Sequence, residues 1–171
     1  KHVVDKFGFD KVYKQGLNIK TPLNLELQKI ATISLRKGLE RYDRRKGWRG
    51  PLTNKKKLNN WKNDLEKYKL EKSIGWHLAI VSKVNKFNAH IRTTEDLNGV
   101  IGYENISWTK KEFEELLKTG DIIYVKKIQD DKYELKQLPK VNGAIVVMDP
   151  FTGRVYALSG GFSFKKSEFN R

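Results

Sequence analysis

The sequence predicts an α+β fold that is mainly β with a few helices. Between about Ile74 and Leu138, five short segments rich in β-branched and aromatic residues follow one another, separated by polar turns. An apolar repeat with helical spacing precedes them, and two strand-like segments joined by a tight turn close the chain. This order predicts a five-stranded barrel of the OB type, inserted into a small subdomain of strand, helix and hairpin.

The N-terminal part is expected to hold one strand and one helix. Residues 11–21 alternate apolar and polar, which predicts a strand with Gly16 as a bulge or turn. Asn24 can cap a following helix by accepting a hydrogen bond from a free first-turn N–H. We expect the helix to end near Asp43, before the Gly50-Pro51 breaker. Its apolar stripe has four-residue spacing: Leu27, Ala31, Leu35 and Leu39.

A second, amphipathic helix is predicted between Lys55 and Lys72. Its apolar residues lie near helical spacing and would cover an apolar surface: Leu58, Trp61, Leu65 and Tyr68.

The predicted barrel strands follow, with a helical interruption at residues 106–117 after the third strand. Such an interruption is typical of a small OB-type barrel. The five strand candidates are residues 76–84, 89–93, 98–103, 121–127 and 132–137.

The last predicted element is a β-hairpin. Residues 144–148 are β-branched and too few for a buried helix, so they predict a strand covered on both faces. Residues 149–153, with Pro150 and Gly153, supply the turn. Residues 154–158 form the returning strand, which Gly160-Gly161 ends.

Composition limits the function classes. The 171 residues lack cysteine, so disulfides and thiolate metal sites are excluded. No apolar run approaches the roughly 18 residues that span a bilayer, and residues 1–10 show no signal-peptide pattern. The chain starts with Lys rather than Met, which fits an excised segment. The net charge of +15 favours anionic partners, although a generally lysine-rich proteome would give the same excess.

Two segments resemble class A penicillin-binding proteins, the bifunctional peptidoglycan synthases. Residues 42–51 read Tyr-Asp-Arg-Arg-Lys-Gly-Trp-Arg-Gly-Pro, a segment of that family. Residues 144–171 contain an apolar strand, Asp-Pro-Phe-Thr-Gly, a second strand, Gly-Gly and Ser-Glu-Phe-Asn-Arg, in the order found where the family's transpeptidase domain opens. The family's catalytic Ser-x-x-Lys comes shortly after this point, so the chain is expected to end before that active site.

The resemblance covers residues 13–171 and implies a domain plan. Residues 1–51 would be a linker with the first strand and helix of the transpeptidase domain. Residues 52–140 would be an OB-like domain with a leading helix, and residues 141–171 the first transpeptidase hairpin.

The resemblance also implies a function. The chain is expected to be a non-catalytic interaction and spacer module, with a parent that is a glycosyltransferase and transpeptidase on the periplasmic face of the bacterial inner membrane. Expected partners are the rest of the parent synthase, a protein regulator of peptidoglycan synthesis and peptidoglycan itself.

No catalytic, cofactor-binding or metal-binding residue is predicted. Penicillin-binding active sites need a serine with a lysine one helical turn later, and a lysine-rich chain matches this pattern by chance. The matches lie in unsuitable contexts: Ser34 with Lys37, Ser107 with Lys110, Ser163 with Lys166, and the turn Lys118-Thr119-Gly120. The histidines, His2, His77 and His90, are too scattered for a recognisable metal site.

Two readings of the positive charge stay open. Residues 42–49, with Lys55–Lys57 beyond them, could form an anion-binding surface, but cations also suit a helix C-terminus without a ligand. The alternative function is an OB-fold protein that binds single-stranded nucleic acid. Its base-stacking residues would be Trp76, Phe87, Tyr103 and Tyr124. Nucleic acid is the less favoured partner, because the flanking segments remain unexplained by it.

Overall fold

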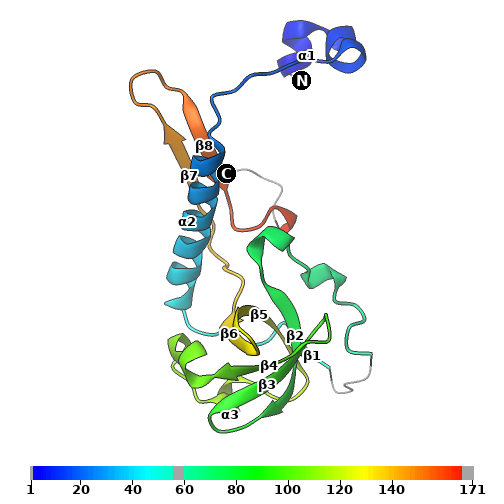
Figure 1. Cartoon of the computed structure of the whole chain (residues 1–171), viewed down its shortest axis with the longest axis vertical. Helices are drawn as coiled ribbons and strands as arrows, with labels where there is room; N and C mark the ends of the chain where they lie inside the picture. The colour runs from blue at the N-terminus through cyan, green and yellow to red at the C-terminus, as the bar shows by residue number, and fades with distance from the viewer. Residues whose placement is uncertain (1, 56–59, 167–171) are drawn as a thin grey trace.

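The computed structural model describes residues 2–55 and 60–166. Figure 1 shows a barrel at one end and a long helix beside a β-hairpin at the other. The N-terminal helix α1 (His2–Phe7) and a π-helical turn (Lys11–Gln15) lie apart from both, joined to the rest by an extended segment.

The predicted five strands form a closed barrel. They are β2 (His77–Val84), β3 (Asn88–Thr93), β4 (Asn98–Gly102), β5 (Asp121–Gln129) and β6 (Lys132–Lys136). The order is β5-β2-β3-β4-β6, and pairing of β5 with β6 closes the ring. All neighbours are antiparallel except β4 and β6, which meet in parallel at Val100 and Lys132. The predicted fold class is therefore confirmed.

A further strand, β1 (Thr53–Asn54), pairs with the start of β5 and was not predicted, since two residues are too few for a visible pattern. The interruption after β4 consists of short turns: two 3₁₀ turns (Tyr103–Asn105 and Ser107–Thr109) and α3 (Phe113–Leu116). Phe113 and Ile106 from this segment are fully buried in the barrel core.

Helix α2 (Leu25–Arg44) forms as the sequence predicts. The side chain of Asn24 accepts a hydrogen bond from the Leu27 N–H at 3.0 Å, which caps the first turn. Ala31, Leu35 and Leu39 are buried, so the predicted stripe faces the interior. It packs against the hairpin and the C-terminal segment, where Phe162 joins the same cluster.

The hairpin consists of β7 (Ala144–Met148) and β8 (Val155–Gly160). Asp149 shapes the turn, because its Oδ1 accepts from the N–H groups of Phe151 and Thr152. The expectation that the first strand is covered on both faces is wrong: Val146 and Met148 are 52% and 53% exposed. Only the face toward α2 is covered.

The strand predicted at residues 11–21 is also wrong. This stretch forms the π-helical turn and an irregular segment instead. The edge of β8 that it could have paired with is occupied by α2. The Asn24 N–H donates to Tyr156 O at 2.9 Å, and the Gln28 amide bonds both backbone groups of Leu158. The segments before and after the barrel still pack together, but the contact is between α2 and the hairpin and not between paired strands.

The helix predicted between Lys55 and Lys72 does not form in the described residues. Asn60 and Asp64 have φ of 60° and 65°, a left-handed conformation that interrupts any right-handed helix. The described part of this stretch has a hydrogen-bonded turn at residues 60–64 and two 3₁₀ turns, Glu66–Tyr68 and Lys72–Ile74. The expectation that the apolar residues of this stretch cover an apolar surface is nonetheless met by Trp61 and Leu65, which are each 2% exposed. Leu58 lies outside the described residues.

Candidate functional site at the junction of helix and barrel

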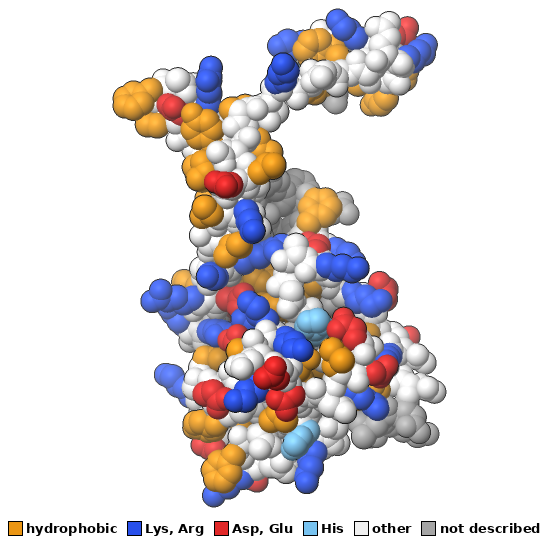
Figure 2. Space-filling model, in the orientation of Figure 1, with side chains coloured by type: hydrophobic (Ala, Val, Ile, Leu, Met, Phe, Trp, Pro, Cys, Tyr) orange, Lys and Arg blue, Asp and Glu red, His pale blue; other side chains and the backbone are white. Residues whose placement is uncertain are grey.

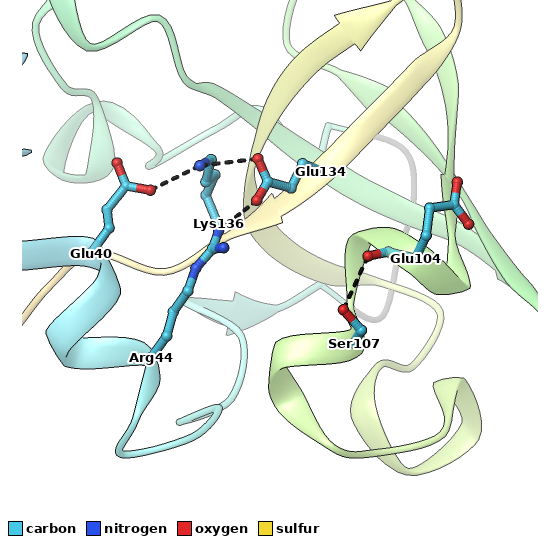
Figure 3. Close-up of polar contacts among 6 residues, drawn as sticks. All are labelled: Glu40, Arg44, Glu104, Ser107, Glu134 and Lys136. Atoms are coloured by element: carbon cyan, nitrogen blue, oxygen red, sulfur yellow. Dashed lines mark hydrogen bonds and ion pairs between the residues drawn. The ribbon is translucent and has the colours of Figure 1, made fainter. Parts of the chain in front are cut away.

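A chain of ion pairs joins α2 to strand β6 of the barrel (Figure 3). Lys136 Nζ lies 2.8 Å from Glu40 Oε2 and 3.1 Å from Glu134 Oε2. Arg44 Nη2 lies 2.6 Å from the other oxygen of Glu134. Glu40 and Arg44 share one helix face because they are four residues apart, and residues 134 and 136 share one strand face. The two elements thus present complementary charges to each other.

Burial makes this ion-pair chain more than a surface contact. The Lys136 side chain is only 8% exposed, and its ammonium lies 5.5 Å from the centre of the Trp76 ring. Burial raises the pKa of the Glu134 carboxyl. The hydrogen bond from Arg44 and the charge and hydrogen bond of Lys136 outweigh this effect, so the pKa of Glu134 lies below its usual value of 4.5. Glu134 is therefore ionised at neutral pH.

Asp43, which lies between Glu40 and Arg44 in the last turn of α2, forms a second connection. Its side chain is 3% exposed and contacts Arg49 Nη1 at 2.8 Å. It also accepts hydrogen bonds from Gln137 Nε2 at 3.0 Å and from the Lys140 N–H at 3.1 Å. Gln137 in turn accepts from the Arg49 N–H at 2.8 Å. This buried carboxylate thus connects the end of α2, the segment after it and the segment that follows β6.

Apolar side chains complete the junction. Two apolar clusters meet here. The cluster beneath the barrel consists of Trp61, Leu65, Leu78, Ile80, Ile122 and Tyr124, and the cluster of α2 and the hairpin contains Leu35, Leu39, Ile74 and Phe162. Leu70, Trp76 and Leu138 each pack against both clusters. Arg36 adds polar contacts, since its guanidinium donates to Phe162 O and Ser73 O. The barrel and the α2–hairpin subdomain therefore share a continuous interior.

A basic cavity of about 570 Å³ opens beside the junction. It lies between the C-terminal end of α2 and the 3₁₀ turn Ser107–Thr109. Its lining residues are Arg41, Arg44, Arg45, Lys46, Gly47, Trp108, Thr109 and Lys110. The Arg44 guanidinium lies 5.0 Å from the centre of the Trp108 ring, and that ring meets Trp48 edge-on. The indole N–H groups of both tryptophans are buried without an acceptor in the described part of the chain.

The predicted basic segment contributes to this region only in part. Arg45 and Lys46 line the cavity, whereas Asp43 and Arg49 belong to the junction. Arg44 belongs to both, because it lines the cavity and pairs with Glu134. Trp61 and Lys55 lie elsewhere: Trp61 is in the cluster beneath the barrel, and Lys55 is 3.6 Å from Asp64. Lys56 and Lys57 fall outside the described residues.

The serines of the discounted Ser-x-x-Lys matches have structural surroundings. Ser163 is buried, and its hydroxyl donates to Glu71 Oε2 at 2.6 Å. The Ser107 hydroxyl donates to Glu104 O, in the preceding 3₁₀ turn, at 3.2 Å (Figure 3). Ser34 is exposed on α2. Gly120 of the Lys-Thr-Gly match turns into β5 with a φ of +91°, beside the backbone oxygen of Lys55.

The described residues offer no candidate metal site and no candidate membrane span. No group of three or more His, Cys, Asp or Glu side chains in residues 2–55 and 60–166 could hold a metal ion. His77 Nδ1 lies 3.0 Å from Glu95 Oε2. Within the same residues, no helix has the length and apolarity needed to cross a membrane.

The four aromatic residues considered for base stacking do not form one surface. Tyr124 is 3% exposed, and its hydroxyl donates to Tyr68 O. Trp76 packs between Tyr124 and Phe162. Phe87 and Tyr103 are exposed, but the other two are part of the junction. The arrangement gives no support to a stacking platform on these residues.

Comparison with known proteins identifies the barrel region. Residues 48–141 match the family model of the penicillin-binding protein OB-like domain. Penicillin-binding protein 1A of Rickettsia prowazekii is 40% identical over 166 residues, covering 95% of this chain and 21% of the relative. Penicillin-binding protein 1A of Pseudomonas aeruginosa is 29% identical over 184 residues, covering 99% and 22%.

The fold is similar to that of a solved relative. The crystal structure of penicillin-binding protein 1A from Haemophilus influenzae superposes with a TM-score of 0.78 at 29% identity, covering 99% of this chain and 26% of that one. The chain spans about a fifth of the length of the curated relatives named above.

Proposed function

The chain belongs to the penicillin-binding protein OB-like domain family, and on this premise we propose that it is a non-catalytic spacer and docking module of a bifunctional class A penicillin-binding protein. The matched model describes an OB-like domain and not a catalytic one. The expected relationship to class A penicillin-binding proteins is thereby confirmed. The parent would act in peptidoglycan synthesis at the periplasmic face of the inner membrane, and regulators would dock on the barrel.

The observation that carries the spacer role is the buried junction. A barrel attached by a flexible linker could not hold two neighbouring domains at a fixed separation. Here the buried Asp43 of α2 contacts Gln137, just after β6, and the buried Lys136 of β6 contacts Glu40 of α2. A change in the orientation of the barrel would break these contacts, so the barrel can transmit a force or a displacement to α2.

The exposed apolar face of the hairpin fits the docking of further protein onto the α2–hairpin subdomain. Val146, Met148 and Leu158 are 52%, 53% and 43% exposed, and Phe151 at the turn is 96% exposed. Figure 2 shows hydrophobic side chains gathered on this projecting part of the molecule. Apolar patches of this kind mark contact surfaces. We propose that the rest of the parent synthase covers this face.

One experiment tests the non-catalytic assignment on the chain itself. The purified 171-residue chain is incubated with a fluorescent penicillin and examined for a covalent adduct after denaturation. We expect no labelling, with a full-length class A synthase as the positive control. Stoichiometric acylation would overturn the assignment.

A second experiment tests the module in its parent. A flexible Gly-Ser linker replaces the barrel between Pro51 and Val141 of the full-length synthase, and glycan polymerisation and crosslinking are measured separately. Both basal activities should persist, while stimulation by a docked regulator should be lost. Loss of both basal activities would place the barrel within the catalytic machinery.

A further inference from the structure

We propose that the basic cavity between α2 and the Ser107–Thr109 turn binds an acidic segment of a partner protein. This inference rests on the proposed docking role and assigns it a place and a chemistry. The cavity presents five cationic side chains: Arg41, Arg44, Arg45, Lys46 and Lys110. No acidic side chain is among the lining residues in the part of the chain that the structure describes.

Most of these charges are available to a ligand. Arg44 is already held by Glu134 at 2.6 Å. Arg41, Arg45, Lys46 and Lys110 are exposed, and none has an ion pair within residues 2–55 and 60–166. Arg45 lies 5.8 Å from the centre of the Tyr42 ring, but none of the four cations has a carboxylate partner in the described residues. They repel each other, and an anionic ligand would relieve that repulsion.

The backbone at Lys110 supports a functional role. Five described residues other than glycine have positive φ, and four of them are Asn or Asp, which tolerate this conformation. Lys110 is the fifth, with a φ of 56°, and it lies at the cavity. A glycine would fit this backbone without strain. Strained residues of this kind cluster at functional sites, where a particular side chain is needed.

The lining favours carboxylates of a peptide over a nucleic acid. Guanidinium groups bind carboxylates in bidentate pairs, and Arg clusters are a recurrent way to recognise acidic motifs. A cavity of about 570 Å³ has room for more than one carboxylate. Single-stranded nucleic acid needs free aromatic faces for stacking. Trp108 is the only aromatic lining residue in the described part of the chain, and Arg44 lies over its ring.

Binding of a fluorescent hexaglutamate peptide to the 171-residue chain tests the proposal, with anisotropy measured at physiological salt. A hexaglutamine peptide controls for charge. The cavity variant carries Arg41→Gln, Arg45→Gln and Lys46→Gln, and we expect it to weaken binding by about tenfold or more. The matched variant Lys72→Gln, Lys83→Gln and Lys86→Gln removes the same charge from exposed positions that do not line the cavity. It should bind nearly as the unchanged chain does.

Lys110→Gly separates binding from folding. It should raise the denaturation midpoint, because the left-handed strain disappears, and weaken peptide binding by about threefold to fivefold. Equal weakening in the cavity and matched variants would overturn the proposal, since only net charge would then matter. Competition by oligo(dT) that depends on the same cavity residues and is tighter than the peptide would overturn the choice of a peptide ligand.

The outcome is distinguishable from failure of the proposed function. Suppose that the cavity variant binds the peptide no more weakly than the matched variant, while the synthase with the replaced barrel keeps both basal activities. This inference alone then fails. If barrel replacement abolishes both activities while the cavity variant still loses the peptide, the spacer role fails and the acidic-peptide site stands.

Discussion

Asp43 shows how a single residue fixes the attachment of the barrel. It continues the apolar stripe of α2 by one turn, yet it is a carboxylate, 2% exposed as a residue. A buried charge is tolerated only when it is paired and hydrogen-bonded. Arg49, Gln137 and the Lys140 N–H meet that requirement. The polar residue thus specifies where α2, its following loop and the barrel's last strand converge.

The first residue-scale prediction concerns this carboxylate. Asp43→Ala removes the ion pair of Arg49 and the acceptor of one Gln137 hydrogen bond and of the Lys140 N–H, while Arg49 keeps Leu138 O and Gln137 keeps Gly47 O. It should lower the free energy of unfolding by about 2 to 3 kcal/mol. Urea denaturation followed by tryptophan fluorescence measures the change. Glu114→Ala, an exposed change on α3, serves as control and should stay within about 0.5 kcal/mol. A loss no larger than the control's would mean that Asp43 does not stabilise the junction.

The second residue-scale prediction is a pH dependence. The pKa of Glu134 is lower in the folded chain than its ordinary 4.5, so the ionised carboxylate stabilises the fold above pH 4.5. That contribution is lost as the pH falls through the folded-state pKa. Other carboxyls, including Glu71 and Asp149, also have lowered pKa values, so the whole chain should weaken in acid.

Comparison with Glu134→Gln isolates the contribution of this one carboxyl. The difference in unfolding free energy between the two proteins should be constant from pH 7 to about pH 5 and shrink below pH 4.5. Denaturant midpoints at several pH values supply the measurement. A difference that stays constant down to pH 3 would show that Glu134 does not titrate as described.

At the scale of elements, β4 contains two glycines with different surroundings. A Cβ on Gly99 would lie 2.4 Å from the ring of the buried Tyr133 and 2.9 Å from Asp131 O. A Cβ on Gly102 would meet only the carboxylate end of Glu104, a flexible side chain that can move away. The close approach of β4 to β6 therefore depends on Gly99 and not on Gly102.

We predict that Gly99→Ala lowers the free energy of unfolding by about 1 to 3 kcal/mol because it overpacks the barrel closure. Gly102→Ala on the same strand should cost less than about 0.5 kcal/mol. Thermal denaturation of the two variants side by side measures both. Equal effects would indicate that general strand propensity matters more than the contact with Tyr133.

Helix α2 and β8 are joined by a side chain that acts as a strand partner. Gln28 Nε2 donates to Leu158 O at 2.9 Å, and its Oε1 accepts from the Leu158 N–H at 3.0 Å. This pairing satisfies an edge that would otherwise be open to another strand. Gln28→Ala should destabilise the chain by about 1 kcal/mol and speed amide exchange at Leu158.

Hydrogen exchange read at single residues checks this prediction. Amides inside the barrel, such as that of Val81, should be protected equally in both proteins. Gln15→Ala, on the exposed π-helical turn, is the matched control. Unchanged exchange at Leu158 would mean that the Gln28 side chain does not protect the edge.

At the scale of the whole molecule, we expect Trp76 to decide whether the chain unfolds as one unit. With Leu70 and Leu138 it packs against both apolar clusters. Trp76→Ala should cost about 3 kcal/mol and separate unfolding of the α2–hairpin subdomain from that of the barrel. In the chain without substitutions, the unfolding transitions should coincide when hydrogen exchange is followed at amides of β7 and of β3.

Phe87→Ala is the control, since Phe87 is 68% exposed on the β2–β3 turn. It should leave the transitions coincident and the midpoint nearly unchanged. A Trp76→Ala variant that still unfolds in one transition would show that the polar contacts alone couple the two parts.

The sequence alone predicted the elements whose signals are local. The cap at Asn24, the stripe of α2, the five barrel strands and the Asp149 turn each depend on residues close in the chain. The family segments at residues 42–51 and 144–161 were likewise readable as linear patterns. The strand prediction at residues 11–21 was wrong because it rested only on alternating apolar and polar residues. A strand also needs the edge of another strand to pair with.

Only the tertiary structure identified the junction and the cavity. Glu40 and Lys136 are 96 residues apart and meet through folding, and a polar Glu134 and Lys136 in a strand give no hint of their partners. The basic segment was visible in sequence, but its division into junction residues and cavity residues was not. The physical reason is that periodicity and turn chemistry are short-range, whereas ion pairing, burial and cavities depend on which distant surfaces the closed barrel and α2 bring together.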